Sequence, residues 1–123
     1  MEMLEVTSRA GSIPDSLVVS LKGPLVVYDL FALQNLLRED LTATTIVDMS
    51  QVPYIDSAGV GMLINAFVSR EKSGRTFALV GVGNRPMAVF KVTHVDSIFP
   101  RFSSVEEAER ALGNGTVSGA ASA

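Results

Sequence analysis

The chain of 123 residues contains no cysteine and no tryptophan, and it has a single histidine. Without cysteine there is no disulfide, no thiolate metal ligand and no thiol nucleophile. The histidine, His94, has no second histidine and no close carboxylate pair at metal-ligand spacing. A dinucleotide-binding reading of Gly81 and Gly83 fails because Pro86 occupies the third glycine position. We therefore expect no metal ion and no bound cofactor.

Basic clusters and long apolar runs are also missing. The formal net charge is -3, the pI is near 5.0, and the lysines and arginines are scattered along the chain. A nucleic-acid-binding surface needs a basic patch, so we expect no nucleic-acid partner. No apolar run reaches the roughly 18–20 residues of a membrane span, and Met1–Glu5 lacks the features of a signal peptide. These absences predict a cytoplasmic domain without membrane insertion.

Hydrophobic residues make up 47% of the chain, which is enough for one well-filled core. The pattern predicts a single domain over residues 1–112 and a disordered tail over 113–123, where the residues are small and polar. Alternating or continuous apolar segments predict strands at 4–7, 17–22, 46–49 and 76–80, with a short final strand within 98–102. Helical spacing predicts helices at 29–41 and 57–72, a third from Pro86 to near His94, and a last one from Ser103 or Ser104 to Ala111.

This order of elements predicts an α/β fold with a single mixed β-sheet of four to five strands and about four helices. The first two strands should pair antiparallel because they lie so close in sequence. In the first helix we expect Asp29 as the N-cap and a buried face through Leu30, Leu33, Leu37 and Leu41.

Several loops should meet where the central strands end. Gly23-Pro24, Pro53 and Gly81–Asn84, with Arg85 next to it, each follow a predicted strand. Carboxyl ends of parallel strands gather at one edge of an open sheet, and binding sites usually lie there. We therefore expect a binding surface at this edge.

Ser57 stands at this edge, at the predicted start of a helix. A hydroxyl at a helix start can cap the helix, attack a substrate or receive a phosphate. Attack needs a base, and His94 is predicted far along the chain, near the end of the third helix. The nucleophile-elbow pattern also fails, because Ile55 stands where a glycine is needed. We expect no enzyme, although a small serine hydrolase stays the alternative from a different class.

The residues after Ser57 suggest a contact surface. Gly59 and Gly61 lie in the first turns of the helix, where each costs about 0.8–1 kcal/mol relative to alanine, so close approach of another surface would explain them. Around the helix, Met62 lies nearly opposite the Val60/Ile64/Phe67 stripe and beside Ala58. This arrangement predicts an exposed apolar strip close to Ser57.

Three segments resemble STAS domains, and more closely the bacterial anti-sigma factor antagonists. They are Ile46–Ser50 followed by Val52–Gly61 with its Asp-Ser-x-Gly core, Leu21–Leu25, and Val80–Val82 with Arg85–Phe90. The likeness extends over about residues 4–112. It implies that Ser57 is phosphorylated by an anti-sigma factor that is itself an ATP-dependent serine kinase. The unphosphorylated form would bind that kinase and free the sigma factor, and a phosphatase would reset the switch.

The resemblance, together with the edge described above, gives a set of partner-binding residues. In it Asp56 flanks the phosphoacceptor and helps to place it against the kinase. The full set is Tyr54, Ile55, Asp56, Ala58, Gly59, Gly61, Met62, Gly23, Pro24, Asn84 and Arg85.

Two positions depart from the family's pattern. Ala58 stands where the family usually has a second hydroxyl residue, and Val26 stands where it often has an acidic one. These departures keep open an alternative, in which the chain is a STAS scaffold subunit of another complex, such as a stressosome-like assembly or a lipid-transport system.

Overall fold

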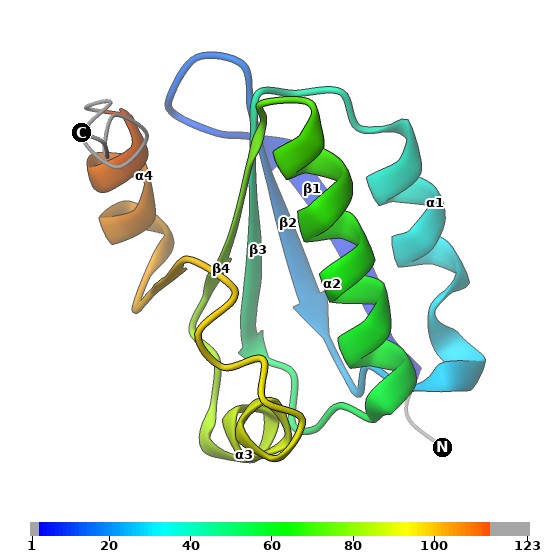
Figure 1. The fold of residues 1–123 in the computed structure, drawn as a ribbon. Helices are drawn as coiled ribbons and strands as arrows, with labels where there is room; N and C mark the ends of the chain where they lie inside the picture. Colours follow the sequence, from blue (N-terminus) through cyan, green and yellow to red (C-terminus); the bar gives the residue numbers. More distant parts are fainter. Residues whose placement is uncertain (1–2, 114–123) are drawn as a thin grey trace.

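The computed structural model describes residues 3–113 and shows a five-stranded mixed sheet with helices on both faces (Figure 1). The strand order is β1-β2-β3-β4-β5; β1 pairs antiparallel with β2, and the other neighbours are parallel. The strands are β1 (Glu5–Ala10), β2 (Ser16–Lys22), β3 (Thr44–Gln51), β4 (Thr76–Val80) and β5 (Arg101–Phe102). The helices are α1 (Phe31–Glu39), α2 (Ser57–Lys72), α3 (Asn84–Val92) and α4 (Val105–Gly113), with a 3-10 turn, η1, at Val27–Asp29. The predicted fold class and the antiparallel first pair are confirmed.

The alternation of side chains along β3 divides the core between the two faces of the sheet. Val47 and Met49 belong to the larger cluster, which includes buried residues of α1 and α2, whereas Ile46 packs with Ala108 of α4 in the smaller one. Figure 1 shows the same division: α1 and α2 lie side by side over one face, α4 covers the other, and α3 sits at the end of the sheet.

Helix α2 has the bounds that the sequence predicts. Asp56 is its N-cap, and Gly74, just beyond its end, has a φ of 73°, which glycine adopts without strain. Val60 and Leu63 are buried, and Ile64 and Phe67 are partly buried against the larger core cluster. The predicted sheet-facing stripe is confirmed.

The predicted start and end of the first helix were wrong. Helix α1 begins at Phe31, and its N-cap, Leu30, makes no side-chain hydrogen bond. Asp29 instead accepts a hydrogen bond from the Leu4 N–H, so its carboxylate ties η1 to the N-terminal segment. Leu41 is 78% exposed because the helix ends at Glu39 and the chain turns away before the periodic face can continue.

The C-terminal elements match the prediction in part. Strand β5 contains only Arg101 and Phe102 of the predicted 98–102 segment. Ser104 Oγ accepts from the Glu107 N–H at the start of α4, as expected for a cap. Helix α4 includes Gly113, and the rest of the predicted tail, 114–123, lies outside the described residues. No helix within residues 3–113 combines the length and apolar character needed to cross a bilayer.

The ends of the parallel strands meet at one edge, as predicted. The Gly23 N–H donates to Gln51 O at 3.0 Å, and Leu25 and Ile55 form an isolated parallel bridge beyond the strands. On the other side of β3, Gly81 has a φ of 68° and approaches Ser50 so closely that a Cβ would lie 2.9 Å from the Ser50 Cβ. This edge brings the loop before α2 next to the segment between β2 and α1.

Candidate functional site

The carboxylate of Asp56 joins two segments at the edge of the sheet. Its Oδ1 accepts from the Gly59 N–H at 3.0 Å and caps α2. Its Oδ2 accepts from the Val27 N–H, also at 3.0 Å, and so fixes η1 against the start of α2. The Asp56 N–H in turn donates to Leu25 O at 3.2 Å. Both carboxylate oxygens are therefore engaged within the chain.

Ser57 is the first residue of α2 and is exposed. Among the described residues, its hydroxyl makes no hydrogen bond, since Asp56 already supplies the cap. The sequence left open whether the Ser57 hydroxyl caps the helix. In the structure it does not. It stands free in solvent at the positive end of the helix dipole.

The two glycines after Ser57 have different surroundings. A Cβ on Gly59 would lie 2.5 Å from Leu25 O and 2.7 Å from Ile55 Cγ1, so the fold itself requires a glycine there. A Cβ on Gly61 would have nothing within 4 Å, and that residue is exposed. The expected close approach therefore occurs inside the molecule at Gly59, whereas no contact within residues 3–113 explains Gly61.

Other predicted partner-binding residues are inside the molecule. Ile55 is only 4% exposed, and Gly23 and Pro24 are buried as well. These residues shape the loops under the site instead of presenting side chains to solvent. Val26, the position of one departure from the family pattern, is buried too.

Tyr54, Asn84 and Arg85 lie at the exposed rim of the site. The Arg85 guanidinium stacks over the Tyr54 ring, with its carbon 5.3 Å from the ring centroid. This cation–π contact connects the start of α3 to the loop before α2, so Arg85 and Tyr54 do come together.

The predicted exposure of Met62 was wrong. Met62 is 8% exposed, because α1 lies beside α2 and covers the helix face that the sequence pattern left open. The exposed apolar side chains near Ser57 come from the preceding segment instead: Val27, Tyr28 and Phe31 are 65%, 64% and 73% exposed. We call these three residues the apolar patch. Their only sequence signal was weak: they are large apolar residues outside the periodic leucine face of the predicted first helix.

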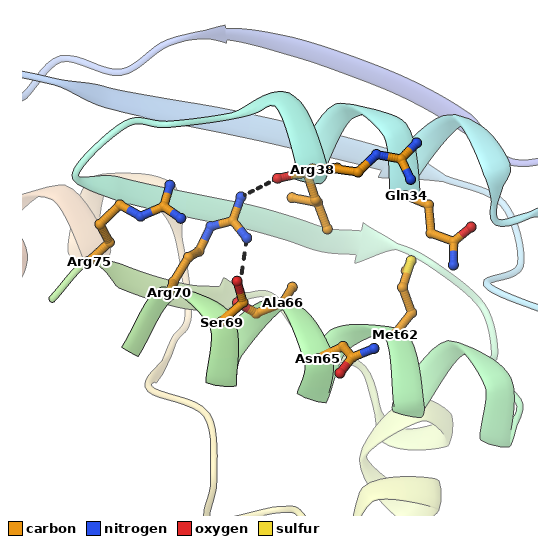
Figure 2. A pocket seen from close by; sticks show the side chains of 9 residues that line it. Gln34, Arg38, Met62, Asn65, Ala66, Ser69, Arg70 and Arg75 are labelled. Carbon is orange, nitrogen blue, oxygen red and sulfur yellow. Dashed lines mark hydrogen bonds between the residues drawn. The ribbon is translucent and has the colours of Figure 1, made fainter. Parts of the chain in front are cut away.

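The other end of α2 carries a buried ion pair that sequence reasoning missed. Arg70 Nη2 lies 3.0 Å from Asp40 Oδ2, and each side chain is 3% exposed. Arg70 also donates to Leu37 O at 2.8 Å and to Ala66 O at 3.4 Å (Figure 2). Burial raises the pKa of the Asp40 carboxyl, but hydrogen bonds from Thr45, Thr42 and Arg70 outweigh it and hold the pKa below its usual value.

The remaining candidates for chemistry are the single histidine and the acidic side chains. His94 is exposed just past the end of α3, with a φ of 62°. Over residues 3–113, no group of three histidine, aspartate or glutamate side chains is arranged to hold a metal ion. What the site presents is a free hydroxyl beside exposed apolar side chains.

Residues 6–108 match the family described as the STAS domain. An anti-sigma factor antagonist from Mycobacterium paratuberculosis is similar in structure, with a TM-score of 0.73 and 22% identity over 87% of this chain and 93% of that one. The Bacillus cell fate determinant SpoIIAA in its phosphorylated form gives 0.67 and 15%, over 87% and 99%. The murine anion transporter Slc26a9 gives 0.67 and 16%, over 94% of this chain but 23% of the transporter. At such identities the solved structures establish a common fold.

Proposed function

The chain belongs to the STAS domain family, and we propose that it is an anti-sigma factor antagonist that is switched by phosphorylation of Ser57. In its unphosphorylated form it binds an anti-sigma factor that is also a serine kinase, and this binding frees a sigma factor. The chain itself catalyses nothing: the partner transfers the phosphoryl group in the cytoplasm, and a phosphatase removes it.

The observation that carries this proposal is the free hydroxyl of Ser57. It is exposed, it has no hydrogen-bond partner within the described residues, and the cap of α2 does not depend on it. A kinase can therefore reach the hydroxyl without breaking any contact of the fold. Similar proteins support the role, since SpoIIAA of Bacillus has been solved in a phosphorylated form.

A phosphate at Ser57 would change binding more than folding. It adds about -1.5 to -2 charges at pH 7, and a helix N-terminus favours a negative charge by about 0.3–1 kcal/mol. In a contact with a partner the same charge must lose water beside the Asp56 carboxylate. A net loss of about 2–3 kcal/mol would weaken binding roughly 30- to 150-fold.

The test is phosphorylation by a purified anti-sigma factor kinase encoded near this protein's gene. With ATP present, we expect one phosphate on the wild-type protein, mapped to Ser57 by mass spectrometry, and none on Ser57→Ala. The matched control is Ser97→Ala, which removes another exposed serine and should be phosphorylated normally. Phosphate on another residue, or equal labelling of Ser57→Ala, would contradict the proposal.

A second candidate is a scaffold role in another complex, favoured by Ala58 and Val26. The structural similarity to a murine anion transporter shows that this fold also occurs within transport proteins. Affinity purification from the native cells separates the two: recovery of a kinase supports the antagonist, and recovery of a transport ATPase or of stressosome-like subunits supports the scaffold.

A further inference from the structure

A continuous groove runs between α1 and α2, away from Ser57. Two adjoining hollows of about 360 and 390 Å³ share Gln34, Met62 and Asn65, so they form one channel on the surface. Along α2 the channel extends from Ala58 to Ser69, a distance of about 16 Å at 1.5 Å per helical residue. We call this channel the α1/α2 groove.

The end of the groove next to Ser57 is apolar. All three residues of the apolar patch line it, together with Leu30 and with Ala58, the neighbour of Ser57. Scattered exposed apolar residues are ordinary, but these line a single hollow, and two of them are aromatic. Burying such side chains against a partner is favourable by roughly 25 cal/mol for each Å² of apolar area.

The other end of the groove is basic, although the whole chain carries a net charge of -3. Arg38, Arg70 and Arg75 line it, and no aspartate or glutamate does. Arg70 is neutralised by Asp40, but within the described residues neither Arg38 nor Arg75 forms an ion pair. Arg38 is exposed and hydrogen-bonded to Asn35, and Arg75 donates to Asp40 O at 2.9 Å. Each guanidinium keeps N–H donors for a carboxylate.

The middle of the groove is lined by two side-chain amides, those of Gln34 and Asn65. The Gln34 and Asn65 side chains are exposed and make no side-chain hydrogen bond within residues 3–113. In Figure 2 they project from α1 and α2 on either side of Met62. Such side chains can pair with the N–H and C=O groups of a bound backbone.

We propose that the α1/α2 groove docks a segment of a partner protein that carries apolar side chains at one end and a carboxylate at the other. The apolar side chains lie on the apolar patch beside Ser57, and the carboxylate pairs with Arg38, whose guanidinium lies apart from that of Arg75 (Figure 2). The order of the two ends is set by the positions of the patch and the arginines. A bound segment needs about five extended residues to cover 16 Å.

This inference goes beyond the proposed function, since it requires neither phosphate on Ser57 nor a kinase. The shape of the groove favours a protein segment over a small anion. A small anion would occupy only the arginine end and leave the apolar patch in water, whereas a segment with both kinds of side chain covers the whole length.

Selection from a displayed library of random peptides of about eight residues tests the proposal with the purified protein alone. We expect enrichment of peptides that combine aromatic or aliphatic residues with aspartate or glutamate. A synthetic enriched peptide should bind Arg38→Glu and Phe31→Ala at least about tenfold more weakly, the loss of one charged hydrogen bond or one buried aromatic contact.

The controls change an exposed arginine and an exposed apolar residue elsewhere on the surface. Arg101→Glu and Val92→Ala alter an exposed arginine of β5 and a 77% exposed valine of α3, and both should keep wild-type affinity. Thermal unfolding confirms that each variant is folded. Enrichment without acidic residues, no enrichment, or equal loss in the controls would overturn the proposal. So would stabilisation by inorganic phosphate without any peptide binding, which would assign the arginines to a small anion. None of these outcomes bears on phosphorylation of Ser57.

Discussion

The two ends of helix α2 differ in how their polar side chains are held. At its C-terminal end, Arg70 is buried with Asp40, and its guanidinium reaches the backbone of α1 at Leu37 and of α2 at Ala66. At its N-terminal end, Asp56 caps the helix and Gly59 packs closely against Leu25 and Ile55, whereas Ser57 and Gly61 are exposed. One end fixes the helix against its neighbours, and the other leaves a hydroxyl free.

This difference explains how a charge could be added to the helix without unfolding it. The buried Arg70–Asp40 pair lies near the end of α2 that is far from Ser57, and the cap comes from Asp56. A phosphate on Ser57 therefore disturbs neither. Substitutions in the Arg70–Asp40 pair should therefore change stability, whereas modification of Ser57 should change binding.

The largest stability effect should come from breaking the ion pair. Asp40→Ala leaves the Arg70 guanidinium buried without its partner, which we expect to cost about 3–5 kcal/mol of unfolding free energy. Urea unfolding followed by circular dichroism measures this. The matched control is Glu39→Ala, an exposed carboxylate one residue earlier, expected within about 0.5 kcal/mol of wild type. Equal stability of the two variants would show that the pair does not hold the helix.

A smaller effect should separate the two glycines near Ser57. Gly59→Ala forces a Cβ against Leu25 O and should destabilise by about 1–3 kcal/mol. Gly61→Ala enters open space in a helix and should stabilise by up to about 1 kcal/mol. The same unfolding measurement compares them. If Gly61→Ala also weakens partner binding, the open position serves the partner; unchanged binding would leave Gly61 unexplained.

The sequence predicted α2 well because its signals are local. The apolar stripe of Val60, Ile64 and Phe67 repeats at helical spacing within one short segment. The buried state of Met62 depends instead on α1 packing beside it, and the Arg70–Asp40 pair joins residues 30 apart in sequence. Asp29 fits a cap by type, yet the neighbouring Leu4 N–H engages it. The sequence pattern failed at these positions because their surroundings depend on contacts between segments that are distant in sequence.

Acid should weaken the C-terminal end of α2 more gently than Asp40→Ala, because protonation neutralises the carboxyl but leaves its oxygens in place. The pKa of Asp40 is lower in the folded protein than its usual value, so its contribution is present above the unfolded pKa, about 3.9. That contribution is lost as the pH falls from there through the folded pKa. Urea unfolding measured from pH 7 to 2.5 should show that the unfolding free energy of the wild type falls below about pH 4. The fall should be shallower in Asp40→Asn, because the amide does not titrate. The same pH dependence in the wild type and in Asp40→Asn would contradict a role for the Asp40 carboxylate in acid unfolding.

The smallest stability effect belongs to Ser57 itself, although its effect on binding is large. The direct test uses protein made with phosphoserine at position 57, and measures its unfolding free energy together with its dissociation constant for the anti-sigma factor kinase. We predict a change in stability of no more than about 1 kcal/mol and binding weakened roughly 30- to 150-fold. Unchanged affinity, or loss of affinity that follows from an unfolded domain, would contradict it.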